Sequence, residues 1–112
     1  MSPTCEPEAA LERLGGDAAL YAEAIAAFLA DEAGLLGRLQ IAIATADAAA
    51  VHAVAHALKG QAGLCGAAAV AETAAQLEAQ GLRRELIETP RTFARLQADL
   101  QQAAIELKPY CR

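Results

Sequence analysis

His56, Lys59 and Gly60 are residues whose types and spacing suit the transfer of a charged group. A histidine with the ordinary pKa of about 6.5 is mostly neutral near pH 7, and its unprotonated ring nitrogen is a nucleophile. On a helix, Lys59 lies on the same face as His56 and can offset the charge of a phosphoryl group there. Gly60 removes a side chain that would otherwise crowd the incoming group. This combination would suit reversible carriage of a phosphoryl group on His56.

The helix expected around His56 has two contrasting faces. On a wheel of about 100° per residue, His56 points almost directly away from the apolar side, so we expect it to face solvent. A glycine costs a helix interior about 1 kcal/mol relative to alanine, and Gly60 and Gly63 therefore indicate that this face must stay accessible. The apolar side consists of Val51, Val54, Leu58 and Cys65, and the expected docking surface around the histidine consists of Ala53, Ala57, Gly63 and Leu64.

Other chemistries fit these residues less well. His52 and His56 are four residues apart and could chelate a transition metal, but no third ligand or H-E-x-x-H carboxylate accompanies them. We therefore expect no metal and no cofactor, and we regard His52 as incidental. Cys65 projects to the apolar side of the wheel, which predicts a small buried hydrophobic residue and not a nucleophile. A solvent-facing histidine is by itself more often plain surface than a phosphoryl acceptor.

The overall composition narrows the class of protein. A length of 112 residues is typical of one domain, which we expect to span residues 1–112. The net charge of −5 and the absence of a lysine and arginine cluster argue against a nucleic-acid partner. The longest aliphatic runs are far shorter than the roughly 18 residues of a membrane span, and no secretory pattern opens the chain. Cys5, Cys65 and Cys111 form no C-x-x-C pair, so we expect unpaired thiols and a cytoplasmic protein.

Helical periodicity and turn residues predict an all-α fold, since no stretch alternates apolar and polar residues as a half-buried strand would. We expect a first helix from Pro7 to Leu14, with Gly15-Gly16 as its stop. A second helix should run from an N-cap at Asp17 to about Ala44, and a third from an N-cap at Asp47 to about Cys65, with a break at Gly66. A fourth should run from Ala67 to Gln80, with Gly81 as the residue after its end, and the last should begin at an N-cap at Thr89, with Pro90 as its first helical residue. The expected inward stripes are Tyr21, Ile25, Phe28, Leu29, Leu36, Leu39 and Ile43 in the second helix and Phe93, Leu96, Leu100, Ala104 and Leu107 in the last. Short connections predict an up-down antiparallel four-helix bundle over about residues 17–107, with the short first helix covering one end.

The segment from Ala55 to Ala67 resembles the signature of the histidine-containing phosphotransfer (HPt) domain family, which reads H-x-L-K-G followed by small residues. The resemblance extends upstream to Gly15-Gly16-Asp17 and downstream to Leu77-Glu78. In that family, the histidine accepts a phosphoryl group from an aspartyl phosphate of a receiver domain and returns it to another. The resemblance thus implies that His56 is the acceptor, with Lys59 as the lysine near the phosphate and Gly60 as the clearance glycine.

The resemblance also implies a residue that orients the histidine ring. Family members commonly place a glutamine or glutamate 22 residues after the acceptor, which here is Glu78. A carboxylate that accepts a hydrogen bond from Nδ1 would hold the ring and leave Nε2 free to attack. If the fourth helix is rotated from this alignment, Gln76 takes the place of Glu78. Gln61 departs from the small serine or alanine that often follows the K-G pair.

The function implied is that of a phosphorelay intermediate, which is a carrier and not an enzyme. The expected partners are response-regulator receiver domains, which supply the metal ion and acidic pocket for transfer, and a sensor or hybrid histidine kinase. We expect a monomer, because the histidine face must remain accessible.

Two alternative functions stay open. One is an adaptor bundle that binds a receiver or kinase without phosphorylation, and the other is the substrate domain of a chemotaxis-type kinase, in which a glutamate at the position of Glu78 also occurs.

Overall fold

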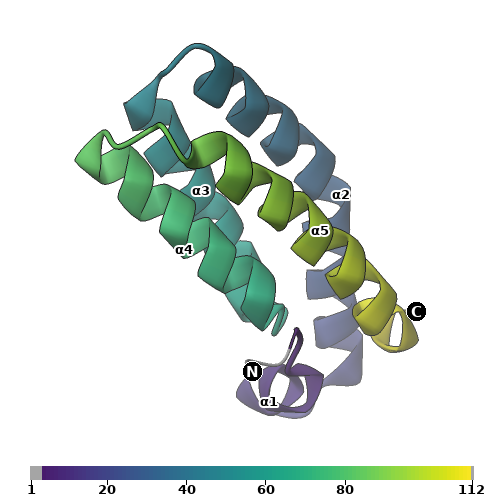
Figure 1. Cartoon of the computed structure of the whole chain (residues 1–112). Helices are drawn as coiled ribbons and strands as arrows, with labels where there is room; N and C mark the ends of the chain where they lie inside the picture. The colour runs from purple at the N-terminus through teal and green to yellow at the C-terminus, as the bar shows by residue number, and fades with distance from the viewer. Residues whose placement is uncertain (1–3, 112) are drawn as a thin grey trace.

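The chain folds into five α-helices followed by one turn of 3₁₀ helix, as a computed structural model that describes residues 4–111 shows (Figure 1). The elements are α1 (Pro7–Arg13), α2 (Ala18–Ala44), α3 (Ala48–Leu64), α4 (Ala68–Arg83), α5 (Thr89–Leu107) and η1 (Lys108–Tyr110). Helices α2 to α5 form an antiparallel four-helix bundle, and α1 lies at the end where α2 begins (Figure 1). The predicted all-α class and architecture are confirmed, and no strand occurs within residues 4–111.

Local sequence signals explain where α2 and α3 begin. The carboxylate of Asp17 accepts a hydrogen bond from the backbone N–H of Leu20, and Asp47 accepts one from Ala50. Each aspartate therefore satisfies one of the N–H groups that a helix start leaves unpaired, as predicted. The predicted break at Gly66 is also confirmed, because its φ of 75° is a left-handed conformation that favours glycine.

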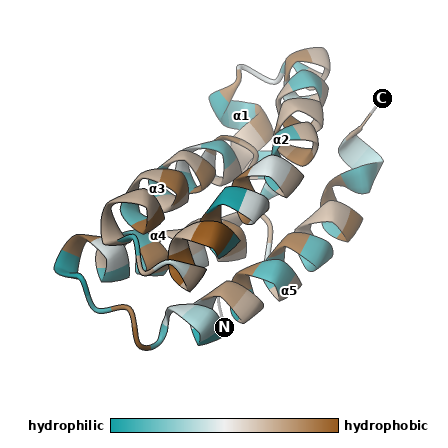
Figure 2. Cartoon of the chain, turned by 90° about the horizontal axis from the view of Figure 1, so that it is seen from above, coloured by the Kyte–Doolittle hydropathy of each residue, from teal (hydrophilic) through white to brown (hydrophobic). Residues whose placement is uncertain are grey.

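Apolar stripes on the four long helices meet in one core. Most of the predicted inward residues are buried or packed against the core, and Leu35, Ala42 and Ala103 join them. Ala104 is only half-buried, so in the last helix Ala103 takes the inward position expected for Ala104. Figure 2 shows hydrophilic and hydrophobic residues recurring in turn along α5, as expected for an amphipathic helix with one apolar and one polar face. None of the helices described is both long and apolar enough to span a lipid bilayer.

The end of the bundle next to α1 is tied together by polar contacts of the backbone. The N–H of Glu6 donates to the carbonyl of Gly66, and the N–H of Ala69 donates to that of Thr4. The buried hydroxyl of Tyr21 donates to the carbonyl of Cys65 at 2.7 Å. Burial raises the pKa of the Cys65 thiol to about 11, so this residue is the inert hydrophobic group that its position on the wheel predicted.

The predicted end of α4 is wrong, because Gly81 lies inside the helix and not after it. The helix continues to Arg83 and ends at Arg84, which adopts the left-handed conformation with a φ of 58°. Gly81 is needed where α4 meets α3. A Cβ on Gly81 would lie 2.6 Å from the backbone nitrogen of His52 and 2.8 Å from the carbonyl oxygen of Ala48. The glycine therefore permits close backbone contact between the two helices.

The start of α5 differs by one residue from the prediction. Thr89 is the first helical residue and Glu88 occupies the N-cap position, without a side-chain capping bond. The hydroxyl of Thr89 donates to the carbonyl of Leu86 at 2.7 Å and so stabilises the preceding turn. Pro90 lies in the first turn of the helix, where its missing N–H costs nothing.

Replacing Gly81 with alanine tests the close contact between α3 and α4. Because the added methyl group would overlap backbone atoms, Gly81→Ala should lower the free energy of unfolding by about 1–3 kcal/mol, measured by urea denaturation. Gly37→Ala is the matched control, since a Cβ there meets open space on an exposed face of α2 and should raise stability by about 0.5–1 kcal/mol. Equal gains in stability for both variants would contradict this contact.

Candidate functional site

His56 lies in the middle of α3 with its side chain directed outward. The imidazole is 68% exposed, whereas Val51, Ala55 and Leu58 of the same helix are completely buried. The burial pattern thus places His56 on the solvent side, as the wheel predicted. An exposed imidazole on a rigid helix is open to a reacting group from outside the protein.

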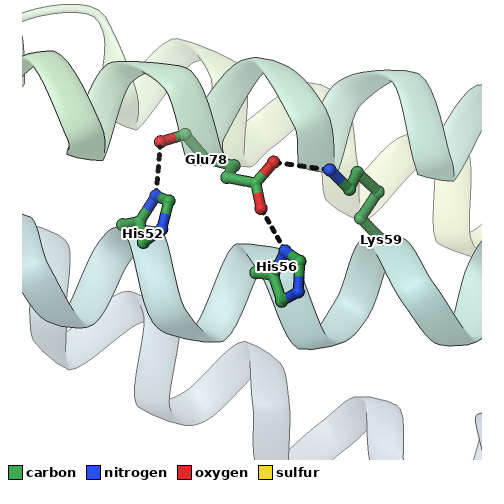
Figure 3. A network of polar contacts seen from close by, with 4 residues as sticks. All are labelled: His52, His56, Lys59 and Glu78. Carbon is green, nitrogen blue, oxygen red and sulfur yellow. Dashed lines mark hydrogen bonds and ion pairs between the residues drawn. The ribbon is translucent and has the colours of Figure 1, made fainter.

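Glu78 reaches across from α4 and contacts both His56 and Lys59 (Figure 3). One carboxylate oxygen, Oε2, is hydrogen-bonded to Nδ1 of His56, and the other, Oε1, lies 2.6 Å from Nζ of Lys59. The Glu78 side chain is only 15% exposed, so both contacts form in a sheltered position between the helices. Of the two candidates for the partner of the ring, the structure brings Glu78 to His56.

The charge state of Glu78 defines the tautomer of His56. The hydrogen bond from Lys59 is the largest influence on the Glu78 carboxyl and, with that from His56, lowers its pKa below the ordinary value. The group is therefore an ionised carboxylate at neutral pH and can only accept hydrogen bonds. Nδ1 of His56 must then carry the hydrogen, and in the neutral ring the lone pair is on Nε2, the nitrogen that Glu78 does not contact.

His52 also contacts Glu78, a connection that the sequence analysis did not anticipate. Nδ1 of His52 lies 3.2 Å from the backbone carbonyl oxygen of Glu78 (Figure 3). The rings of His52 and His56 are 6.4 Å apart between centroids and nearly parallel, at 18°. The spacing of four residues could have shown that both histidines share a face. It could not have shown that His52 has a partner on α4.

Lys59 is paired with Glu78, a contact that the position of Lys59 on the wheel does not reveal. Its side chain is 37% exposed, and its ammonium lies on the same side of α4 as the His56 contact. Gly60, one turn after His56, faces open space, and a Cβ there would meet no other part of the protein within 4 Å. The surface next to the histidine is therefore unobstructed.

The four residues expected in the docking surface differ in exposure. Ala53 and Ala57 are exposed, and Leu64 is 51% exposed. Gly63 is half-buried, and its carbonyl accepts a hydrogen bond of 3.0 Å from the guanidinium of Arg13.

Two glutamines that the sequence analysis singled out lie away from the histidine ring. Gln76 lines a hollow between α4 and α5 with Arg91 and Arg95, so it does not take the place of Glu78. Gln61 donates a hydrogen bond of 3.1 Å to Asp31 of α2. It connects α3 to α2 on the flank of the helix.

The polar groups gathered at His56 suit a carrier of a charged group. Within residues 4–111, no cluster of three or more histidine, cysteine, aspartate or glutamate side chains is arranged to hold a metal ion. The site instead offers one oriented nucleophilic nitrogen, a carboxylate behind the ring, and an ammonium beside it. Such an arrangement can hold a phosphoryl group, while the chemistry of its delivery can come from another protein.

One solved structure resembles this fold, and one family model matches this sequence. The crystal structure of histidine-containing phosphotransfer protein B (HptB) from Pseudomonas aeruginosa PAO1 is similar, with a TM-score of 0.87 and 23% sequence identity, over 97% of this chain and 95% of that one. At this identity the likeness supports the fold. A search of curated protein sequences gives no significant match. Residues 23–106, which include His56, Lys59 and Glu78, match the family described as Hpt domain. The chain therefore belongs to the Hpt domain family, the histidine phosphotransfer domains of phosphorelays.

Proposed function

We propose that His56 accepts a phosphoryl group from the aspartyl phosphate of one receiver domain and passes it to another receiver. The lone pair of Nε2 attacks phosphorus in line, the N–P bond forms, and the P–O bond to the aspartate breaks, which leaves a carboxylate on the receiver. The observation that carries this proposal is the bond from Nδ1 of His56 to Glu78, which directs the lone pair to the exposed nitrogen.

Glu78 and Lys59 have complementary roles in this proposal. As Nε2 forms its bond to phosphorus, positive charge develops on the imidazole ring, and the carboxylate at Nδ1 stabilises that charge. Lys59 supplies a cation one turn away from the phosphoryl oxygens and also holds Glu78 in place. Hpt domains are phosphocarriers, and in this chain we expect the receiver to provide the metal ion and the acidic pocket.

The docking surface for a receiver should lie over α2 and α3. Ala53, Ala57 and Leu64 present small or apolar side chains near His56. Beside Ala57, a groove between α2 and α3 contains Gly34 and Arg38. The small and apolar side chains beside this groove make the surface partly apolar, which suits a transient interface. We propose that the protein acts as a monomer whose histidine face stays open for successive partners.

The acceptor is tested by phosphorylation with candidate receivers. The purified protein is mixed with receivers that were phosphorylated by a small-molecule donor, and the transfer of label is followed for wild type and His56→Gln. Wild type should gain acid-labile, base-stable label, and the variant should gain none, because the amide has no nucleophilic nitrogen. Receiver binding without any label on wild type, and equal binding by the folded variant, would contradict the carrier function and favour an adaptor.

Gly60→Leu separates clearance for a partner from reactivity of the histidine. Leucine is a better helix former than glycine, and a Cβ at this exposed position meets open space, so the variant should be at least as stable as wild type in urea denaturation. Transfer from a phosphorylated receiver should slow by about tenfold or more, which corresponds to about 1.4 kcal/mol of lost docking. Phosphorylation by the small donor phosphoramidate should change by less than about threefold. Equal slowing with both donors would show that Gly60 does not serve partner clearance.

A further inference from the structure

His52 is held beside the phosphoryl acceptor by an interaction that fixes its ring in a defined orientation. A carbonyl oxygen can only accept a hydrogen bond, so Nδ1 of His52 must donate to the backbone of Glu78. Nε2 of His52 therefore carries the lone pair when the ring is neutral and an N–H when the ring is protonated. The bond to Glu78 is compatible with both states, and His52 can gain or lose a proton without turning its ring.

The two histidine rings present the same edge to their surroundings. Both use Nδ1 toward Glu78, and their planes are nearly parallel (Figure 3). Nε2 of His52 therefore lies on the same side as Nε2 of His56, one helical turn closer to the N-terminus of α3. A phosphoryl group on His56 would add three acceptor oxygens and negative charge in the space beside the His52 ring.

The charged groups bonded to one another at the site carry no net positive charge that would balance a phosphoryl group. Arg38 of α2 lines the groove beside Ala57, and Arg84 after α4 lies beside Ala48 and Ala49. The charged side chains bonded to the rings are Glu78 of α4 and, through Glu78, Lys59 of α3. These two charges already neutralise each other at 2.6 Å. A phosphoryl group on His56 would add negative charge without adding a cation. Among the groups bonded to Glu78, His52 is the one besides the acceptor itself that can take up a further proton.

A metal ion shared by the two histidines fits the geometry less well. Ring nitrogens that bind one zinc ion at about 2.0–2.1 Å can be no more than about 4 Å apart. The ring centroids are 6.4 Å apart and the planes are almost parallel, so the rings would have to tilt toward each other. That movement would break the bonds of both Nδ1 atoms to Glu78.

We propose that His52 is a proton-responsive residue that stabilises the phosphoryl group. When His56 is phosphorylated, His52 takes up a proton from solvent at Nε2 and becomes a cation in addition to Lys59. This inference rests on the proposed function of His56. It makes the phosphorylated state more favourable at mildly acidic pH, because only protonated His52 attracts the phosphoryl oxygens. If the phosphoryl charge lies about as far from the His52 ring as the two ring centroids lie from each other, which is 6.4 Å, each unit of negative charge in a water-like medium raises the proton affinity of His52 by about threefold, or about half a pH unit.

NMR titration of the ring signals of His52 tests the proposal directly. The chain contains only two histidines, so His56→Gln assigns the signals. Wild-type protein is titrated between about pH 5 and pH 9, before and after phosphorylation with phosphoramidate. The titration midpoint of His52 should move to higher pH by about half a unit or more upon phosphorylation. An unchanged midpoint, or one at lower pH, would overturn the proposal.

A transfer equilibrium provides the second measurement. Wild type and His52→Gln are each mixed with the same phosphorylated receiver at pH 6 and pH 8; the glutamine amide can still donate to Glu78 but does not titrate. The ratio of phosphoryl group on His56 to that on the receiver should increase from pH 8 to pH 6, by a factor that is about three times larger in wild type than in His52→Gln. Identical pH dependence of this ratio in the two proteins would contradict the role of His52.

If neither phosphoramidate nor a receiver phosphorylates His56, the proposed function fails, and this inference fails with it. Phosphorylation without a shift of His52 refutes only the inference.

Discussion

The backbones of α3 and α4 meet at Gly81, and the positions of the functional side chains depend on this contact. Any side chain at residue 81 would overlap the backbone of Ala48 and His52. With the helices this close, Glu78, which lies one turn earlier on α4, can reach α3 with both its backbone and its side chain. A glycine one turn away from the chemistry thus determines whether the carboxylate meets the imidazole. Packing and function are therefore coupled at this interface.

Glu78 is the group through which the other polar residues of the site are connected. Its two carboxylate oxygens contact His56 and Lys59, and its carbonyl accepts from His52. Lys59 is the main influence that lowers the pKa of Glu78, and its hydrogen bond holds the carboxylate that fixes the tautomer of His56. Lys59 can thus act on the histidine through Glu78 as well as directly on a phosphoryl group. The exposed nitrogen remains reactive because the opposite nitrogen is bound.

Much of this arrangement is predictable from the sequence, and the exceptions have physical reasons. The caps at Asp17 and Asp47 and the outward direction of His56 follow from local rules and helical periodicity, and the structure confirms them. The role of Gly81 does not follow from these rules, because a glycine that ends a helix and a glycine that permits close packing look the same in a sequence. The contact of His52 was missed since its partner is a backbone carbonyl, a group that every residue carries. The choice between Glu78 and Gln76 depends on the rotation of α4 against α3, which only tertiary packing sets.

The central claim is that Glu78 holds His56 with its hydrogen on Nδ1 and so leaves Nε2 free for the phosphoryl group. Long-range ¹H–¹⁵N NMR spectra of the unphosphorylated protein at about pH 8 measure which ring nitrogen carries the hydrogen. The account predicts that His56 is mainly the Nδ1-H tautomer in wild type. In Glu78→Ala this preference should be lost. A predominant Nε2-H tautomer in wild type, or a tautomer unaffected by Glu78→Ala, would contradict it.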